Sequence, residues 1–401
     1  MSSAEHVLAA LTRLLEEAHL AVPEQLPDVV AAAGGALGCT VTVYLVDYEQ
    51  RHLMPVPPAG GEGGDPLAID STLAGRAYRT VAPVHGESGQ PRLWLPLLDG
   101  VERLGVLDVQ LPADTDLDDP ELREHLRWFA TLAGHLVGVK TPYGDGLDRV
   151  RRRRPRTVGA ELVWQMLPPL TFGCEGLVVS GMVEPCYELG GDTFDYAVQD
   201  GTAHLSVFDA VGHTLRSGVL SAVVLSAYRN GRREHRGLFT TAQGIDEALA
   251  EQFDPSLFAT GVLAELDLAS GRLRYVNAGH PPPLVLRHGK VVKSLPDGRR
   301  PPFGLGQTQL TVAEERLEPD DWVVLYTDGI TEARNRDGTR FGVDGLTDIL
   351  ERSAADRQPA PETLRRVTHA VMDHQSGVLQ DDATLLVAQW ATGREQGLWA
   401  D

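Results

Sequence analysis

The side chains best suited to chemistry in this chain are aspartates, and they occur in four short motifs far apart in the sequence. Each motif sets one or two aspartates beside a run of β-forming residues and a turn. Carboxylates gathered at strand ends repel one another and lose hydration, so a fold that collects them normally supplies a cation. The motifs are Gly190–Asp195, Phe208–His213, Tyr326–Ile330 and Gln380–Thr384.

A site made of carboxylate oxygens favours hard cations, so magnesium or manganese is expected rather than zinc, which prefers histidine or cysteine. Two such ions roughly 3.5–4 Å apart can acidify a water molecule and hold a phosphoryl group for attack. Phosphoester hydrolysis is the matching reaction. For any single aspartate the alternative is a turn residue, because Asp-Gly and Asp-Asp are common in loops.

Length and composition narrow the class of protein. With 401 residues and 42% hydrophobic content, the chain is long for one domain and predicts two. A net charge of -20 argues against binding to nucleic acid or to an anionic membrane. No apolar run is long enough for a membrane helix and no signal peptide is recognisable, so we expect a soluble, cytoplasmic protein. Cys39, Cys174 and Cys186 are expected to be free thiols.

The first part of the chain, residues 1–140, predicts a small α+β sensor domain with helices at both ends. Its strands Trp94–Leu98 and Leu104–Val109, joined at Asp99-Gly100, resemble the paired central strands of GAF domains. The alternative is an unspecialised dimerisation domain without a ligand. Helical spacing recurs at 1–20, 23–37, 73–79 and 119–139, and strand-like runs lie at 40–46, 93–98 and 104–109.

Residues 141–168 predict a linker, because the composition shifts to proline, glycine and charged residues. Its basic run, Arg151–Arg154, is interpreted as a solvated hinge or the flank of a helix rather than as a nucleic-acid patch or an address. Glu161 to Leu167 predicts a short helix that can serve as a switch, ended by Pro168-Pro169.

Residues 169–392 predict a second domain of two stacked sheets flanked by helices, followed by a tail at 393–401. Strand-like runs alternate with helical stretches and dense hairpin signals. The strand-like runs lie at 177–183, 204–207, 262–268, 272–277, 284–287, 322–326 and 384–389, and the helical ones at 216–229, 240–252, 345–352 and 362–374.

The four motifs, with Asn277–Pro282 between them, resemble the stage II sporulation E-type serine/threonine phosphatases, a bacterial branch of the metal-dependent protein phosphatase 2C superfamily. The resemblance implies an αββα sandwich with two Mn²⁺ or Mg²⁺ ions at one edge. It implies that Asp209 bridges the ions and that Asp209 and Asp328 serve in activating the water. The ligands carried over are Asp192, Asp209, Asp328, Asp381 and the backbone carbonyl of Ala210.

Five further residues are supporting candidates. Asp195 and Asp382 each either orient a water behind the ligands or cap a turn. Asn277 and His280 either shape a hairpin beside the site or contact the substrate. His213 either donates a proton to the leaving group or faces solvent at a helix start.

The resemblance also implies a substrate, a phosphorylated anti-sigma-factor antagonist of a partner-switching pathway. The GAF-like domain would report a small ligand, a redox state or a partner, and the flanking helices allow a homodimer. One alternative is a degenerate phosphatase domain that binds without hydrolysis. Another is a diguanylate cyclase, since Gly190-Gly191-Asp192-Thr193-Phe194 resembles the Gly-Gly-Asp-Glu-Phe signature, but Thr193 replaces its acidic residue and a basic linker lies upstream.

Overall fold

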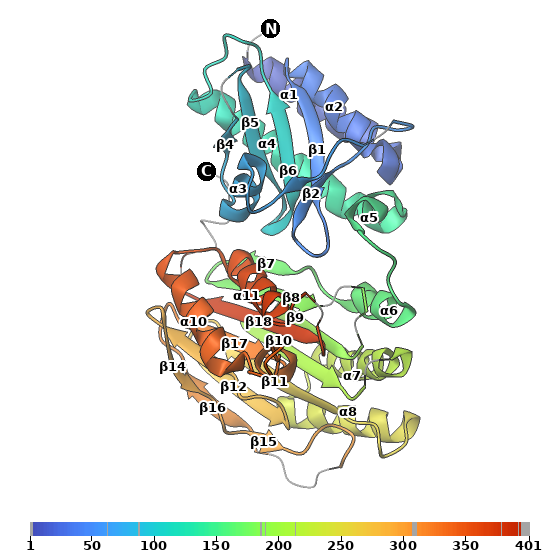
Figure 1. Cartoon of the computed structure of the whole chain (residues 1–401), viewed down its shortest axis with the longest axis vertical. Coiled ribbons are helices and arrows are strands. Elements are labelled where there is room, and N and C mark those ends of the chain that lie inside the picture. The colour runs from blue at the N-terminus through green and yellow to red at the C-terminus, as the bar shows by residue number, and fades with distance from the viewer. Residues whose placement is uncertain are drawn as a thin grey trace. The chain divides into compact units, whose positions relative to one another are not determined.

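The computed structural model describes residues 3–61, 63–86, 89–184, 187–188, 190–212, 214–306, 311–377, 379–391 and 393. The chain divides into two compact units that meet in the sequence between Arg154 and Pro155 (Figure 1). The stretch predicted as a linker holds a helix of each unit, α5 (Gly146–Arg151) in the first and α6 (Val158–Met166) in the second. Cys39 and Cys174 are free thiols, and Cys186 lies outside the described residues.

The N-terminal unit is built on one antiparallel sheet with the strand order β3-β2-β1-β6-β5-β4. Its predicted central hairpin is confirmed, because β5 and β6 pair along their length and turn at Gly100, which has a φ of 60°. The resemblance to GAF domains stays a prediction. The strands are β1 (Thr40–Val46), β2 (His52–Pro55), β3 (Leu67–Ala68), β4 (Val84–His85), β5 (Arg92–Asp99) and β6 (Glu102–Gln110).

Helices cover both faces of this sheet. One apolar cluster joins α1, α2 and α4 to one face, and a smaller cluster joins α3 to the other. The central strands β5 and β6 are therefore buried on both faces and read as nearly continuous apolar runs. The helices are α1 (Ser3–Leu20), α2 (Leu26–Ala36), α3 (Leu73–Thr80) and α4 (Pro120–Lys140), with 3-10 turns at Pro23–Gln25 and Thr141–Tyr143.

The C-terminal unit is a sandwich of two sheets, as predicted. One sheet has the order β15-β12-β11-β10-β9, with β16 beside β12, and the other has the order β14-β13-β17-β18-β8-β7. The strands are β7 (Thr171–Cys174), β8 (Leu177–Glu184), β9 (Asp192–Gln199), β10 (Thr202–Ala210), β11 (Ala259–Asp267), β12 (Arg272–Ala278), β13 (Leu284–Arg287), β14 (Lys290–Ser294), β15 (Arg299–Arg300), β16 (Ala313–Arg316), β17 (Trp322–Tyr326) and β18 (Ala383–Trp390).

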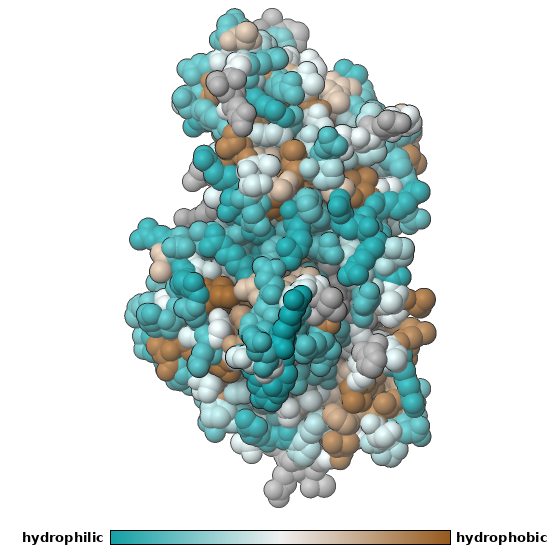
Figure 2. All heavy atoms as spheres, in the orientation of Figure 1, coloured by the Kyte–Doolittle hydropathy of each residue, from teal (hydrophilic) through white to brown (hydrophobic). Residues whose placement is uncertain are grey.

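Helices form the outer layers of this αββα arrangement (Figure 1). An apolar cluster between the two sheets forms the centre, a second joins α7 and α8 to the first sheet, and a third joins α9, α10 and α11 to the second sheet. Figure 2 shows a largely hydrophilic visible surface with scattered apolar patches. The helices are α7 (Leu215–Arg233), α8 (Leu238–Gln252), α9 (Asp328–Thr331), α10 (Gly342–Ala355) and α11 (Ala360–His374).

Strand β9 is the main element that the sequence pattern did not predict. It carries Asp192 and Asp195, and aspartate is depleted in strands because its side chain competes for backbone hydrogen bonds. Both aspartates are nevertheless buried, since partners from other elements satisfy them. None of the described helices is long and apolar enough to cross a membrane.

Candidate metal centre

The four acidic motifs meet at one edge of the sandwich. In the first sheet, Asp192 at the start of β9 pairs in register with Asp209 near the end of β10. In the second sheet, Asp328 follows β17 and begins α9, while Asp381 and Asp382 come just before the neighbouring strand β18. Across the sandwich, β18 contacts β9 and β17 contacts β10. The chain thus brings together motifs that the sequence separates widely.

Asp382 connects the second sheet to the Gly-Gly-Asp motif of the first. Its Oδ2 accepts hydrogen bonds from the backbone N–H groups of Gly190 at 2.7 Å, Gly191 at 2.7 Å and Asp192 at 3.3 Å. A carboxylate that accepts several amide N–H groups forms strong, charge-assisted hydrogen bonds. The side chain of Asp382 therefore holds the backbone turn that leads into β9, which agrees with the capping role considered for it.

Thr327 is a site residue that sequence reasoning missed. Its buried hydroxyl donates to Asp192 Oδ2 at 2.7 Å and accepts from the backbone N–H of Thr384 at 2.9 Å. Its own N–H donates to the carbonyl oxygen of Thr384 at 3.0 Å. One hydroxyl thereby orients a proposed ligand across the two sheets. The only sequence signal was a hydroxyl residue directly before Asp328.

Small residues allow the motifs to approach closely. A Cβ atom on Gly191 would overlap the carbonyl oxygen of Ala210, and a Cβ atom on Gly329 would overlap the backbone of Asp382. Helix α7 supports the same turn, because the Ser217 hydroxyl donates to the Gly190 carbonyl oxygen at 2.9 Å. Glycine at these positions is therefore required by space rather than by backbone torsion.

Burial and mutual repulsion make the carboxylates reluctant to ionise. Burial first, and then the charges of Asp328, Asp381 and Asp382, raise the pKa of Asp209 to about 7. Burial also raises the pKa of Asp192 well above its usual range, with Asp209 and Asp382 adding to the effect. The pKa of Asp328 is raised by burial first and by Asp381 second. A cation at this edge would relieve the repulsion.

The donor atoms fit a hard cation in kind and charge, since all of them are oxygens. Yet within the described part of the chain, no three histidine, cysteine, aspartate or glutamate side chains lie close enough to hold an ion as they stand. The carboxylates are therefore close enough to raise one another's pKa, but they do not surround a common point. An ion would have to draw them together.

Asp195 lies farther along β9 and is held away from this edge. Its carboxylate accepts from Arg229 at 2.7 Å and from Arg232 at 2.8 Å, both on α7. Arg229 also donates to the carbonyl oxygen of Met166 at 2.7 Å. Asp195 thereby joins β9 to α7 and, through Arg229, to the end of α6.

Asn277 and His280 shape the turn that follows β12. The Asn277 Oδ1 accepts from the His280 N–H at 2.8 Å, and the His280 Nδ1 lies 2.7 Å from the Thr260 hydroxyl. Thr260 in turn pairs with Asp209 across β10 and β11. Burial lowers the pKa of His280 to about 3, so the ring is neutral. His213 lies outside the described residues, so its role as a proton donor stays a prediction.

The layered sandwich and its acidic edge define the class of domain, a protein phosphatase 2C-type fold. Residues 199–391, just under half of the chain, match the family model described as stage II sporulation protein E. The match overlaps three of the four motifs and leaves the Gly-Gly-Asp motif just upstream. It gives no support to the cyclase alternative.

Known proteins are similar over part of the chain. Protein IcfG of Synechocystis sp. is 24% identical over 60% of this chain, which spans 42% of that protein. Phosphoserine phosphatase RsbU of Bacillus subtilis is 22% identical over 53% of this chain, which spans 63% of that protein. Among solved structures, the RsbU and RsbW domains of a Mycobacterium tuberculosis protein give a TM-score of 0.48 at 24% identity, covering 54% of this chain and 62% of that one.

Proposed function

We propose that the chain is a Mn²⁺- or Mg²⁺-dependent phosphatase of phosphoserine and phosphothreonine in proteins. The observation that carries the proposal is that Asp192, Asp209, Asp328 and Asp381 lie at the same edge of a phosphatase 2C-type sandwich, where the charges of Asp328 and Asp381 raise the pKa of Asp209. These side chains and the Ala210 carbonyl oxygen are the proposed ligands of two ions. The match to the family model and the similarity to a phosphoserine phosphatase support the reaction class.

The chain's own residues have separate tasks in this mechanism. Bound divalent ions supply positive charge that acidifies a water and neutralises phosphoryl oxygens. Asp209 and Asp328 come from different sheets, so together they fix the position of that charge across the sandwich. Thr327 and Asp382 position Asp192 through its carboxylate and its backbone N–H. Buried His280 is neutral and supports the strand beside Asp209.

The proposed substrate is a phosphorylated anti-sigma-factor antagonist. Support comes from the family resemblance of the motifs and from the similarity to RsbU, a protein named as a phosphoserine phosphatase. The N-terminal unit would act as the sensor.

Helix α6 is the proposed switch between the two units. It packs against α7, and Arg229 connects the end of α6 at Met166 to Asp195 of β9. A shift of α6 would therefore displace β9, the strand that begins with Asp192. If a fragment of residues 157–401 had the same phosphatase activity as the full chain and responded to regulation in the same way, the proposal that α6 is a switch would be wrong.

The reaction is tested by turnover of a phosphoserine peptide with the full chain and Mn²⁺. We expect Asp209→Asn and Asp328→Asn to lose at least about a thousandfold in kcat, because each removes a charge needed at the reacting centre. The matched control is Asp254→Asn, which changes an exposed aspartate outside the acidic motifs. A wild-type chain that bound phosphoprotein without turnover would favour the degenerate alternative.

A further inference from the structure

The N-terminal unit contains an open cavity of about 710 Å³ between α3 and the sheet. It is lined on one side by α3, with Arg76 in its first turn and Arg79 in its last, and on the other side by Arg92 and Trp94 of β5. Three arginines line this one cavity, although the chain has a net charge of -20. The cavity is therefore a local exception to the acidic character of the molecule.

Two of these arginines have no partner within the described part of the chain. Arg92 is neutralised by Asp108, at 2.6 Å and 2.8 Å, and stacks over the Trp94 ring at 4.4 Å. By contrast, neither Arg76 nor Arg79 makes a side-chain hydrogen bond or an ion pair with a described residue, and the Nε of Arg79 is buried without an acceptor. A buried donor left unpaired costs about 1–3 kcal/mol, so such a group normally has an acceptor in the working molecule.

The start of α3 adds to the positive potential of the cavity. Thr72 caps the helix by accepting from the Gly75 N–H at 3.0 Å, and the remaining N–H groups of the first turn have no partner within the helix. A helix N-terminus and guanidinium groups both favour an oxyanion. Asp70 also lines the cavity, which leaves one carboxylate against two unpaired guanidinium groups. The balance is positive.

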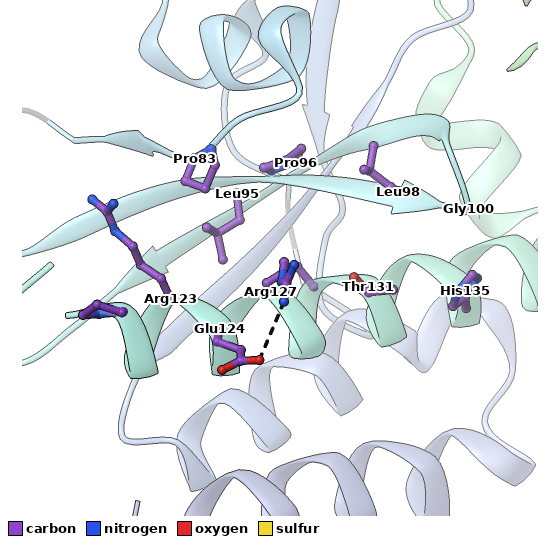
Figure 3. A pocket seen from close by; sticks show the side chains of 12 residues that line it. Pro83, Leu95, Pro96, Leu98, Gly100, Arg123, Glu124, Arg127, Thr131 and His135 are labelled. Atoms are coloured by element: carbon purple, nitrogen blue, oxygen red, sulfur yellow. Dashed lines mark ion pairs between the residues drawn. The ribbon is translucent and has the colours of Figure 1, made fainter. Parts of the chain in front are cut away.

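A second cavity of the same unit provides an internal comparison. This groove of about 290 Å³ runs along α4 beside β5 (Figure 3), and its arginines already have acidic partners. Arg127 lies 3.8 Å from Glu124, and Arg123 lies 2.5 Å from Asp118. An anion that entered this groove would have to displace a carboxylate. The cavity beside α3 requires no such exchange.

We propose that the cavity beside α3 binds a small molecule that carries a phosphate or carboxylate group. Arg79 and Arg76 are the residues that would bind this anionic group. Both arginines line the cavity, Arg79 half-buried and Arg76 exposed, and neither has a side-chain partner among the described residues. Trp94, held by Arg92, gives the cavity one flat apolar wall for the body of the molecule. This proposal does not rest on the phosphatase activity, and it gives a chemistry to the ligand of the proposed sensor unit.

The test is isothermal titration calorimetry on the full chain after removal of divalent metals, so that the acidic edge of the C-terminal unit repels anions. Inorganic phosphate and citrate are titrated separately at constant ionic strength, and the two arms distinguish phosphate from carboxylate recognition. We expect at least one to bind with a stoichiometry of one. Arg79→Gln should weaken binding at least about tenfold and Arg76→Gln by a smaller factor, because charge-assisted hydrogen bonds to guanidinium are lost.

Two further variants serve as controls. One tests whether the anion binds in the cavity beside α3 rather than in the groove along α4. The other tests whether binding needs the planar guanidinium group of Arg79 or only its positive charge. Arg127→Gln removes the same charge from the groove along α4 and should leave the affinity unchanged. Arg79→Lys keeps the charge but loses the fork, so its affinity should fall between those of the wild type and Arg79→Gln. Without anion, Arg79→Gln should keep the thermal midpoint of the wild type, since Arg79 has no described partner to lose. If Arg79→Gln does not fold, Arg76→Gln decides the outcome, because Arg76 is exposed.

Three results would overturn the proposal. The first is an absence of binding by both anions to the wild-type chain. The second is an equal loss of affinity in Arg127→Gln and in the two variants of the cavity. The third is unchanged affinity in both Arg76→Gln and Arg79→Gln.

Discussion

At the scale of single residues, substitution of Thr327 is the most direct test of which hydrogen bonds hold Asp192 at the acidic edge. Its hydroxyl makes two buried hydrogen bonds, one to Asp192 and one from Thr384. Thr327→Val keeps the shape but leaves both partners unsatisfied, so we expect a loss of about 1–3 kcal/mol in the free energy of unfolding. Urea unfolding of the metal-free chain measures this loss.

The matched control is Thr193→Val. Thr193 is fully buried, and its hydroxyl has no hydrogen-bond partner among the described residues. The same substitution there removes a polar atom that is already unsatisfied, so stability should stay the same or rise. Equal losses in the two variants would mean that the hydroxyl of Thr327 is not what holds Asp192.

The adjacent residues Asp381 and Asp382 should respond in opposite ways to the same change. Asp382→Asn weakens three charge-assisted bonds to backbone N–H groups. We expect this loss to exceed the repulsion of Asp192 and Asp209 that the change also relieves, so the metal-free chain should lose about 1–3 kcal/mol of stability. Asp381→Asn removes a charge that repels Asp209 and Asp328, so metal-free stability should be kept or increased while Mn²⁺ affinity falls. Unfolding curves with and without Mn²⁺ compare the two variants. If Asp381→Asn lost metal-free stability and Asp382→Asn kept it, Asp381 rather than Asp382 would be the residue that holds the turn.

The sequence allowed the acidic residues to be predicted but not their partners. Asp209 and Asp328 each follow an apolar run and a turn, which is a local pattern that a sequence displays directly. The acceptor role of Asp382 depends on backbone N–H groups that lie far away in the chain. Such contacts arise from tertiary packing, and no local spacing encodes them.

At the scale of elements, the turn after β12 carries a buried titratable group, His280. Burial depresses its pKa from the ordinary histidine value of 6.5 to about 3 in the fold. The unfolded chain therefore binds the proton first as the pH falls. The contribution of neutral His280 to the free energy of unfolding is therefore complete above pH 6.5 and is lost progressively as the pH falls toward 3.

This sign gives a pH prediction. Between about pH 7.5 and about pH 5, the wild-type chain should lose about 2 kcal/mol more stability than His280→Asn, because ~1.5 pH units below the unfolded pKa each cost ~1.4 kcal/mol. At the higher pH the variant should be the less stable protein, since it alters the contact with Thr260. Urea unfolding at both pH values measures the difference, and parallel losses in the two proteins would contradict buried protonation at His280.

Elements differed in how well their patterns predicted them. The amphipathic helices α7, α8, α10 and α11 were placed to within a few residues, because their apolar spacing is long and regular. Strand β9 was not predicted, since its aspartates are tolerated only through Arg229 and Thr327 from other elements. Short edge strands such as β14 and β15 carry too few residues for a periodic pattern.

At the scale of the whole molecule, two units with separate cores were predictable from length and from the shift in composition. The division itself falls after Arg154, inside the predicted linker, and the basic run Arg151–Arg154 belongs to the first unit. Arg151 illustrates the reason, because its Nε donates to the carbonyl oxygen of Val46 at 2.9 Å and its guanidinium stacks over Tyr48. A basic run that appears solvated in sequence can thus be an integral part of a fold.

Separate cores and a repulsive acidic edge lead to a prediction about thermal unfolding. A ligand that binds only the folded state stabilises it by RT ln(1 + [L]/Kd), or about 2.7 kcal/mol at a hundredfold excess over Kd. Calorimetry should therefore show one transition that Mn²⁺ moves upward, assigned to the C-terminal unit, and one that it leaves in place. Asp209→Asn should raise the first midpoint without metal, because it removes a buried charge among carboxylates, and should abolish its response to Mn²⁺. A full Mn²⁺ response in Asp209→Asn would place the ions elsewhere, whereas upward shifts of both transitions would indicate that metal binding and the fold of the N-terminal unit are coupled.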